Sequence, residues 1–427
     1  MTIAIINARL LDPATDYDGP GAILIEDGRI SEVVHGPVSH IPDGIKVIDA
    51  QGRCLAPGLI DIRVKTGEPG NEPKETLKSA SLSAAAGGVT TIVVQPDTEP
   101  ALDDPAMIDH IQRRGAALEL VHVRAAGSAT QKREGQRMAE IGLMHEAGAL
   151  YFTDGDRVIQ NSRTLQRVMS YAAAFNALIA CRPVEPWLSE GAVATSGELA
   201  TRLGLPSVPA IAERIQLDRD LALVELTGAR FLVDQISTEG ALEVLARARG
   251  RGLDVAASVS INHLCFNEID IGDYRTFYRL DPPLRRESDR QALAEAVRDG
   301  LIDAITSAHA PEPAENKRRP FAEAEPGAIG LETLLPAALM LHHEHGLDLL
   351  DVLRPLTQGP ANLLGLEAGV LAAGAPADLV LFDAGAPVVI DAAQLRSKSK
   401  NSPFDGRRLQ GKVLLTIVQG RIVHDNL

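Results

Sequence analysis

The feature that most constrains the fold is the alternation of short apolar runs with amphipathic stretches through the middle of the chain. The runs TTIVVQP, ALELVHVRAA, GALYFTD, NALIACRPVE, RFLVDQIS, LDVAASVS and IDAITSAHA are strand-like, and STEGALEVLARARGRG and SDRQALAEAVRDG space apolar residues three and four apart. Such repeated units predict a (β/α)₈ barrel of the TIM type. The second choice is an open doubly wound sheet. Neither GxGxxG after the first strand nor GxxxxGKS/T supports it.

The two chain ends have a different texture from the middle. Residues 1–55 and 368–427 hold short β segments separated by Gly, Asp and Pro turn signals. We therefore expect one small, sandwich-like β domain built from both ends, with the barrel over 56–367.

Composition narrows the classes of partner and cofactor. Lys+Arg 42 against Asp+Glu 57 gives a net charge of −15, which disfavours nucleic acid and anionic membranes. With neither a secretory signal pattern nor an apolar run of about 18 residues, the sequence predicts a cytoplasmic protein. Three scattered cysteines without CxxC predict neither a disulfide framework nor a cysteine zinc site.

Five ordered motifs carry a family resemblance over nearly the whole chain. They are APGLIDIRVKTGEPG at 56–70, AAAGGVTTIVVQPDTEP at 84–100, GELATRLGLPSVPAIAERI at 197–215, DPPLRRESDR at 281–290 and AHAPEPAENKRRPFAEAEPGAIGLETLLP at 308–336. Together they resemble the dihydroorotases of the amidohydrolase superfamily. The resemblance implies a barrel whose one or two divalent cations activate a water and polarise a ring amide carbonyl.

Four of the family's metal-binding histidine positions hold other residues here. The resemblance places the H-x-H pair on Arg63 and Lys65, whose cations have no lone pair for a metal. It places the two later histidines on Arg182 and Gln235. The sequence therefore predicts no bound cofactor, and zinc only if this alignment is wrong.

Of the family's two carboxylate positions, one is retained in this sequence and the other is lost. The metal-binding aspartate of the middle strand is matched by Asp154 in FTDGD, whereas the acid/base aspartate of D-H-A-P-H falls on Ala308. Loss of one acid/base group typically lowers a rate by about 10²–10⁴. Loss of the metal also removes the activated water.

Positions that contact substrate in the family have changed as well. The resemblance puts the arginine that grips the substrate carboxylate on Gly67, and the other contacts on Asp97, Asp281 and Glu312. This predicts a vestigial substrate pocket that has lost a cation and gained acids. We therefore expect a catalytically inactive dihydroorotase homologue.

Arg63, Lys65 and Arg182 place three cations where the resemblance expects ligands for dications. Our hypothesis is an internal ion-pair network with Asp154 and Asp61 that replaces the charge of the metals. Two alternatives stay open. The side chains could reach solvent at an open barrel mouth, or they could bind an anionic ligand.

The remaining histidines leave one route to a metal. His263 and His309 could join Asp154 as three zinc ligands, although the resemblance places neither in the ligand set and predicts that both are structural residues near the pocket. His122, in a predicted barrel strand, is the other candidate.

The partner prediction rests on analogy. In some bacteria an inactive dihydroorotase-like chain assembles with aspartate transcarbamoylase in pyrimidine biosynthesis, and this sequence is similar to such chains. We expect that partner and a homo-oligomer. The alternatives are an active metal-dependent dihydroorotase, a related cyclic amidohydrolase acting on a hydantoin or allantoin, and a sensor that binds carbamoyl aspartate or dihydroorotate.

Overall fold

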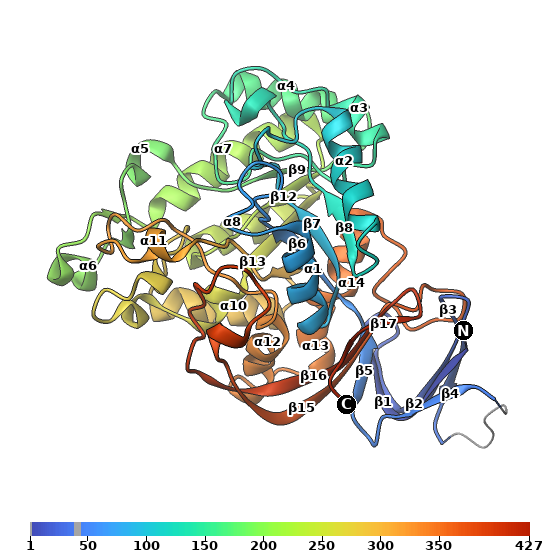
Figure 1. Cartoon of the computed structure of the whole chain (residues 1–427). Coiled ribbons are helices and arrows are strands. Elements are labelled where there is room, and N and C mark those ends of the chain that lie inside the picture. The colour runs from blue at the N-terminus through green and yellow to red at the C-terminus, as the bar shows by residue number, and fades with distance from the viewer. Residues whose placement is uncertain (1, 38–43) are drawn as a thin grey trace.

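The computed structural model describes residues 2–37 and 44–427 and has two parts (Figure 1). A barrel of parallel strands is surrounded by helices, and a sheet built from both chain ends lies next to the barrel, at the lower right in Figure 1. Both parts match the architecture predicted from the alternating pattern. Within the described residues, no helix combines the length and the apolar character needed to cross a bilayer.

The barrel closes through seven strands and one short bridging segment. The strands are β6 (Leu59–Val64), β7 (Val89–Val94), β8 (His122–Ala125), β9 (Ile179–Cys181), β12 (Phe231–Val233), β13 (Val255–Ser260) and β14 (Ala304–Thr306). They pair in parallel as β6-β7-β8 and β9-β12-β13-β14. Bridges at Phe152 join β8 to β9, and a bridge between Val64 and His309 closes the ring.

The predicted strand GALYFTD is shorter than its sequence suggests. Only Phe152 forms ladder bridges, one to Gly127 and one to Ile179. Its flanking backbone groups are nevertheless paired, because Gly127 N–H donates to Tyr151 C=O and Phe152 N–H donates to Leu178 C=O. This segment therefore fills the fourth position of the barrel.

Helices cover the outer face of the barrel. They are α1 (Leu77–Ala86), α2 (Pro105–Ala116), α3 (Ile141–Glu146), α4 (Ser162–Ala173), α5 (Pro186–Ser189), α6 (Glu198–Leu203), α7 (Ile211–Thr227), α8 (Glu239–Gly250), α9 (Ile261–Cys265), α10 (Glu287–Arg298), α11 (Ala314–Lys317), α12 (Leu334–His343), α13 (Leu349–Leu353) and α14 (Gln358–Leu364). The amphipathic spacing correctly predicted α8 and α10, which bury Leu242, Leu245 and Leu293. A two-stranded pair, β10 (Ala194–Thr195) and β11 (Ser207–Val208), lies outside the barrel ladder.

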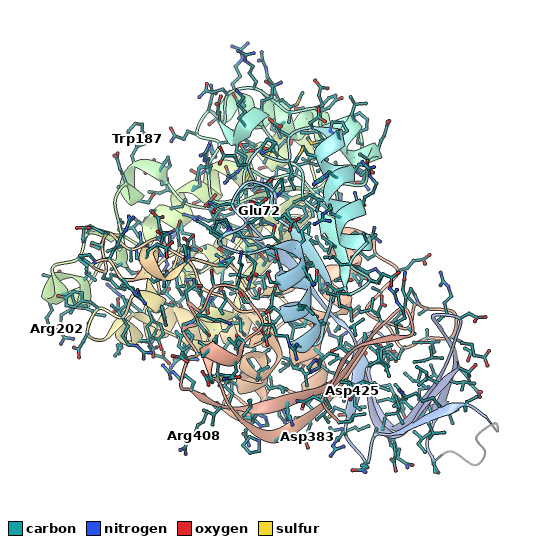
Figure 2. The ribbon with its side chains drawn as sticks, in the orientation of Figure 1. Glu72, Trp187, Arg202, Asp383, Arg408 and Asp425 are labelled. Carbon is teal, nitrogen blue, oxygen red and sulfur yellow. The ribbon has the colours of Figure 1, made fainter. Side chains whose placement is uncertain are left out.

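The terminal sheet joins both chain ends. Its strands are β1 (Ile3–Asp12), β2 (Tyr17–Glu26), β3 (Arg29–His35), β4 (Lys46–Asp49), β5 (Cys54–Pro57), β15 (Leu379–Val389), β16 (Arg408–Val418) and β17 (Arg421–Asp425). The ends meet where β5 pairs with β15 in antiparallel register. Asp383, Arg408 and Asp425 mark its C-terminal strands in Figure 2.

The connection between β15 and β16 returns to the barrel mouth. Asn401 donates its side-chain amide to the backbone carbonyls of Ala310 and Gly327 at 3.1 and 3.0 Å, and its own carbonyl oxygen accepts from Glu312 N–H. Ser397 donates to the buried carboxylate of Glu75. These contacts fix the loop that follows β14, which forms one wall of the candidate site.

Candidate functional site

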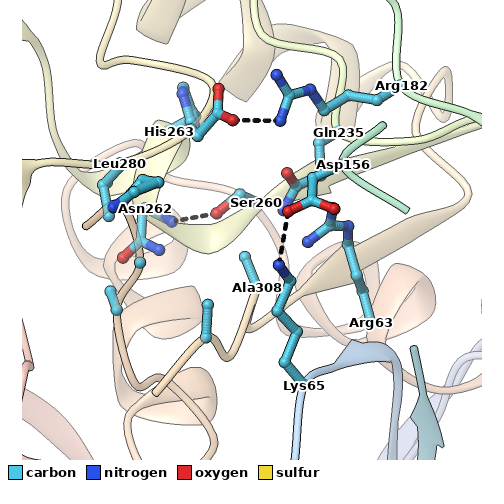
Figure 3. A pocket seen from close by; sticks show the side chains of 15 residues that line it. Arg63, Lys65, Asp156, Arg182, Gln235, Ser260, Asn262, His263, Leu280 and Ala308 are labelled. Carbon is cyan, nitrogen blue, oxygen red and sulfur yellow. Dashed lines mark hydrogen bonds and ion pairs between the residues drawn. The ribbon is translucent and has the colours of Figure 1, made fainter. Parts of the chain in front are cut away.

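A small cavity lies at the carboxyl ends of the barrel strands, where enzymes of this fold place their chemistry (Figure 3). Its volume is about 40 Å³. That is room for a few water molecules. The lining side chains that bear on its chemistry are Arg63, Lys65, Asp156, Arg182, Gln235, Asn262, His263, Asp281 and Ala308.

Arg63 is held by a buried ion pair. It lies on β6, and its Nε donates to Asp234 Oδ2 at 2.7 Å, with side-chain exposures of 5% and 6%. Burial alone would lower the pKa of Arg63, but attraction to Asp234 and the hydrogen bond between them raise it above its usual value. Asp234 follows β12 directly and also accepts from Ser258 Oγ. The Arg63 cation is therefore permanent.

Lys65 bridges two carboxylates. Its Nζ lies 2.9 Å from Asp97 Oδ2 and 3.0 Å from Asp156 Oδ2. Although burial opposes the charged form, both carboxylates together raise the pKa of Lys65. Arg133 pairs with the other carboxylate oxygen of Asp156, Oδ1. Burial would raise the pKa of Asp156, but Lys65 and Arg133 hold it well below the usual range.

Arg182 is the third cation at the mouth. It follows β9 and donates from Nη1 to Asp281 Oδ2 at 2.6 Å. The side chain is 6% exposed, so it does not extend into solvent. Arg63, Lys65 and Arg182 thus form the predicted ion-pair network, but with carboxylates other than the predicted ones.

The expectation that Asp154 and Asp61 neutralise these cations is wrong. Asp154 accepts hydrogen bonds from Ser128 Oγ, Thr130 Oγ1 and Thr130 N–H, and burial raises its pKa. Asp61 accepts from the backbone N–H groups of Arg63 and Ser307, and burial raises its pKa to about 6. Both carboxylates therefore organise backbone rather than face the cavity.

Ala308 and Gln235 adopt the left-handed backbone conformation, with φ of 50° and 61°. Non-glycine residues in this region store strain, and such residues gather at functional sites. The side chain at 308 is a methyl group that can neither bind a metal nor transfer a proton. The side-chain oxygen of Gln235, Oε1, has no hydrogen-bond partner among the described residues.

The histidines do not assemble around a metal. His263 lines the cavity and its Nε2 lies 3.3 Å from the Pro283 carbonyl, while burial lowers its pKa to about 4. His309 is fully buried, with Nδ1 accepting from Gly330 N–H and Nε2 lying 3.4 Å from Glu75. His122 is the first residue of β8 and therefore lies at the opposite end of the barrel, 2.9 Å from Asp378.

The positions that contact substrate in the family are changed in ways that shape the pocket wall. A Cβ at Gly67, where φ is +76°, would lie 2.4 Å from the Asn71 carbonyl oxygen, so an arginine does not fit without moving the turn. Glu312 pairs with Lys74 at 2.6 Å, Asp97 with Lys65 and Asp281 with Arg182. Each acid gained is thus matched by a cation.

Comparison with known proteins decides the family. The dihydro-orotase-like family model matches residues 52–241, and the amidohydrolase family model matches residues 224–423. A dihydroorotase of Anaplasma phagocytophilum is 39% identical over 99% of this chain and 95% of its own length. The chain belongs to the dihydroorotase family. The resemblance inferred from the five motifs is therefore confirmed.

Other relatives of this dihydroorotase homologue carry related names. A dihydroorotase-like protein of Pseudomonas aeruginosa is 38% identical over the whole of both chains. The structure of an L-hydantoinase (dihydropyrimidinase) from Arthrobacter aurescens superposes with a TM-score of 0.89 at 27% identity, covering 99% of this chain and 96% of that one. The fold of the chain is thus shared with this L-hydantoinase over nearly its whole length.

The residues of this dihydroorotase homologue do not fit the metal that the family implies. Among residues 2–37 and 44–427, no three His, Cys, Asp or Glu side chains are grouped as metal ligands. The carboxylates that line the cavity, Asp156 and Asp281, are already paired with Lys65 and Arg182, and Asp234 is paired with Arg63. A divalent cation would have to displace permanent positive charges, so we derive no chemical step through it.

The sequence analysis missed the partners of the cations. Asp234 precedes Gln235 directly, and Asp156 lies two residues after Asp154, so both acids lie close to positions that the resemblance singles out. Arg133 and Asn401 come from distant loops without a local signal. An acid beside a family ligand position, whether substituted as at Gln235 or retained as at Asp154, is the signal that points to Asp234 and Asp156.

Proposed function

We propose that this dihydroorotase homologue does not hydrolyse cyclic amides and serves pyrimidine biosynthesis as a structural or regulatory partner of aspartate transcarbamoylase. The observation that carries the loss of activity is the buried Arg63–Asp234 pair, at 2.7 Å, in the mouth of the barrel. The guanidinium already provides, beside this carboxylate, the positive charge that a metal would otherwise supply.

The missing proton-transfer group supports the same proposal. Ala308 has no acid or base, and the two carboxylates that line the cavity, Asp156 and Asp281, are held in ion pairs with Lys65 and Arg182. Loss of the acid/base group alone lowers a rate by about 10²–10⁴. The described cavity offers no replacement for an activated water.

Metal content and hydrolysis test the loss of activity together. The protein is expressed in medium supplemented with zinc, manganese and iron, its metal content per chain is measured, and it is assayed with dihydroorotate. We expect substoichiometric metal and no turnover above a heat-inactivated sample, alongside a hydrolysing family member as positive control. One or two tightly held equivalents of metal with turnover would overturn the proposal.

We propose that the partner contacts exposed apolar side chains around α5. Trp187 on α5, the only tryptophan of the chain, is 75% exposed and points outward (Figure 2). Leu188 and Ile215 are 42% and 46% exposed, and α5 is attached to the start of α7 because Glu185 N–H donates to Ala212 C=O. Exposed apolar groups of this kind favour a protein partner.

Co-purification tests the partnership. Tagged full-length chain and aspartate transcarbamoylase from the same organism are co-expressed and separated by size. We expect one co-eluting complex, at least tenfold weakened by Trp187→Glu, with Tyr171→Glu on α4, 37% exposed, as a matched surface control. Separate elution of the wild-type proteins would refute the partnership without bearing on hydrolysis.

Hydrolysis of a cyclic amide is the second candidate function. The dihydroorotase names of several full-length relatives and the superposition on the L-hydantoinase favour it. The same metal-supplemented preparation assayed with dihydroorotate, hydantoin and allantoin separates the two candidates. Metal-dependent turnover of any of them favours the enzyme.

A further inference from the structure

The cavity at the barrel mouth has hydrogen-bond donors that the ion pairs do not use. Arg63, Arg182, Gln235 and Asn262 line it, and each of these residues is at most 6% exposed. They come from four strand ends, since Arg63 lies on β6, Arg182 and Gln235 follow β9 and β12, and Asn262 lies in α9 directly after β13. Figure 3 shows these side chains around the cavity.

Both guanidinium groups keep free donors. Arg63 donates to Asp234 through Nε, and its two Nη atoms make no hydrogen bond with the described residues. Arg182 uses Nη1 for Asp281, and its Nε and Nη2 have no hydrogen-bond partner in the same part of the chain. The two Nη groups of an arginine form a flat edge that can donate two parallel hydrogen bonds to a planar anion. On Arg63 this edge is unused.

Two carboxamides add further donors. Within residues 2–37 and 44–427, neither end of the Gln235 or Asn262 side chain makes a hydrogen bond, and both oxygens are completely buried. The nitrogens are not completely buried, so each amide turns its NH₂ group toward the cavity. Polar groups of buried side chains are almost always completed by protein, water or a ligand. The cavity therefore holds a species that accepts hydrogen bonds.

Charge around the cavity is divided by depth. The ion pairs of the mouth involve four cations and four carboxylates, namely Arg63, Lys65, Arg133 and Arg182 with Asp97, Asp156, Asp234 and Asp281. The cluster as a whole is therefore neutral. The lining, however, holds three of the cations and two of the carboxylates. These two, Asp156 and Asp281, have side chains 38% and 36% exposed, against 5% and 6% for Arg63 and Arg182. An anion deep in the cavity thus meets guanidinium groups, with the carboxylates at the rim.

The volume of the cavity selects a small ligand. About 40 Å³ holds about three waters, or one anion of about three to four non-hydrogen atoms. Dihydroorotate and carbamoyl aspartate, with more than about ten such atoms each, exceed this space. A planar one-carbon oxyanion such as formate or bicarbonate fits it. Its oxygens can accept from the free edge of Arg63, from Arg182 and from the two amides.

We propose that the barrel mouth binds one planar one-carbon oxyanion, formate or bicarbonate, on the free donors of Arg63, Arg182, Gln235 and Asn262. This position differs from the one at which the family grips a substrate carboxylate, because the resemblance places that arginine on Gly67. The inference rests on the proposed function in one respect, since it needs a barrel mouth without metal.

Calorimetric titration of the full chain with sodium formate and sodium bicarbonate tests the site, with chloride exchanged at constant ionic strength and the metal content measured beforehand. Asn262→Asp and Gln235→Glu each replace an NH₂ donor by a carboxylate oxygen of similar size. The matched control is Asn176→Asp, which makes the same exchange on an exposed residue before β9, at the opposite end of the barrel. Thermal unfolding checks that every variant is folded.

We expect saturable 1:1 binding to the wild type with a Kd of about 0.1–10 mM, as the small size of the ligand allows. The affinity should fall about tenfold or more in Asn262→Asp and in Gln235→Glu, and change less than about twofold in Asn176→Asp. The anion that binds more tightly is the ligand. No saturable binding of either anion, or unchanged affinity in both cavity variants, overturns the proposal.

Dihydroorotate tests the size of the site. We expect that it does not displace the bound anion, and displacement would overturn the assignment to a one-carbon ligand. The two proposals fail in different ways. A chain that holds metal and hydrolyses dihydroorotate overturns the proposed loss of activity, whereas a metal-free, inactive chain that binds neither anion overturns only the present inference.

Discussion

Replacing Asp234 with asparagine removes the charge of the most buried ion pair at the barrel mouth and keeps its shape. At 2.7 Å and an effective dielectric constant of about 20, the attraction between Arg63 and Asp234 is about 6 kcal/mol. Part of it is retained by the hydrogen bond to the asparagine oxygen. Removing one partner of a buried pair typically costs about 3–5 kcal/mol, because the other charge stays buried.

This cost is measurable by thermal unfolding. For 427 residues an unfolding entropy near 2.1 cal/mol/K per residue gives about 0.9 kcal/mol/K, so Asp234→Asn is expected to lower Tm by about 3–6 °C. The matched surface control is Asp109→Asn, which breaks the 2.6 Å pair with Arg113 at exposures of 53% and 73%. It should cost less than about 0.5 kcal/mol.

The double variant Arg63→Met with Asp234→Asn shows whether the cost comes from the unpaired charge. With the cation gone, most of the lost stability should return. Together with the single variants Arg63→Met and Asp234→Asn, the double variant forms a double-mutant cycle, which should give a coupling free energy between the two side chains of about 2–3 kcal/mol. In the double variant, where Arg63 no longer needs it, the single amide oxygen of the introduced asparagine can accept from Ser258 Oγ. If Asp234→Asn costs no more than Asp109→Asn, the reasoning that a buried pair occupies this mouth is refuted.

Three further predictions concern single residues of the site. Ala308→Gly should raise the free energy of unfolding by about 0.5–1 kcal/mol in urea, because φ is +50° there, and a loss would contradict the strain. Asp156→Asn should cost more than Asp97→Asn by thermal unfolding, because Asp156 faces both Lys65 and Arg133, and equal losses would contradict this. Burial lowers the pKa of folded His263 to about 4 from 6.5, so the unfolded chain binds more protons in that window and stability falls as pH drops from 6.5 to 4. His263→Gln should flatten this part of the Tm–pH curve, and an unchanged slope would contradict it.

The barrel could be predicted because its signal is local and repeated. Strand β7 is buried along its whole length, as parallel strands covered by helices are, and its residues 92–94 continue an apolar run that the sequence shows directly. The segment around Phe152 shows the limit. Its apolar pattern predicts a strand, but its pairing is restricted to one residue between β8 and β9.

The site could be predicted only as far as positions along the chain define it. The resemblance correctly placed Arg63, Lys65 and Arg182 at the strand ends, but the choice of their partners depends on side-chain geometry. Asp154 is turned toward Thr130 and away from the cavity, whereas Asp156, two residues later, faces it. His122 was misjudged because membership of a strand does not say at which end a residue lies.

Replacing the two cations with neutral glutamine tests whether they replace the charge of a metal. Arg63 and Lys65 balance the negative charges of Asp234, Asp97 and Asp156. Arg63→Gln with Lys65→Gln removes that charge at any pH, because a glutamine amide does not titrate. In EDTA, Tm should therefore fall at least as far as in Asp234→Asn. Wild-type stability without metal would mean that these carboxylates need no cation, and that the basic side chains do not hold the mouth together.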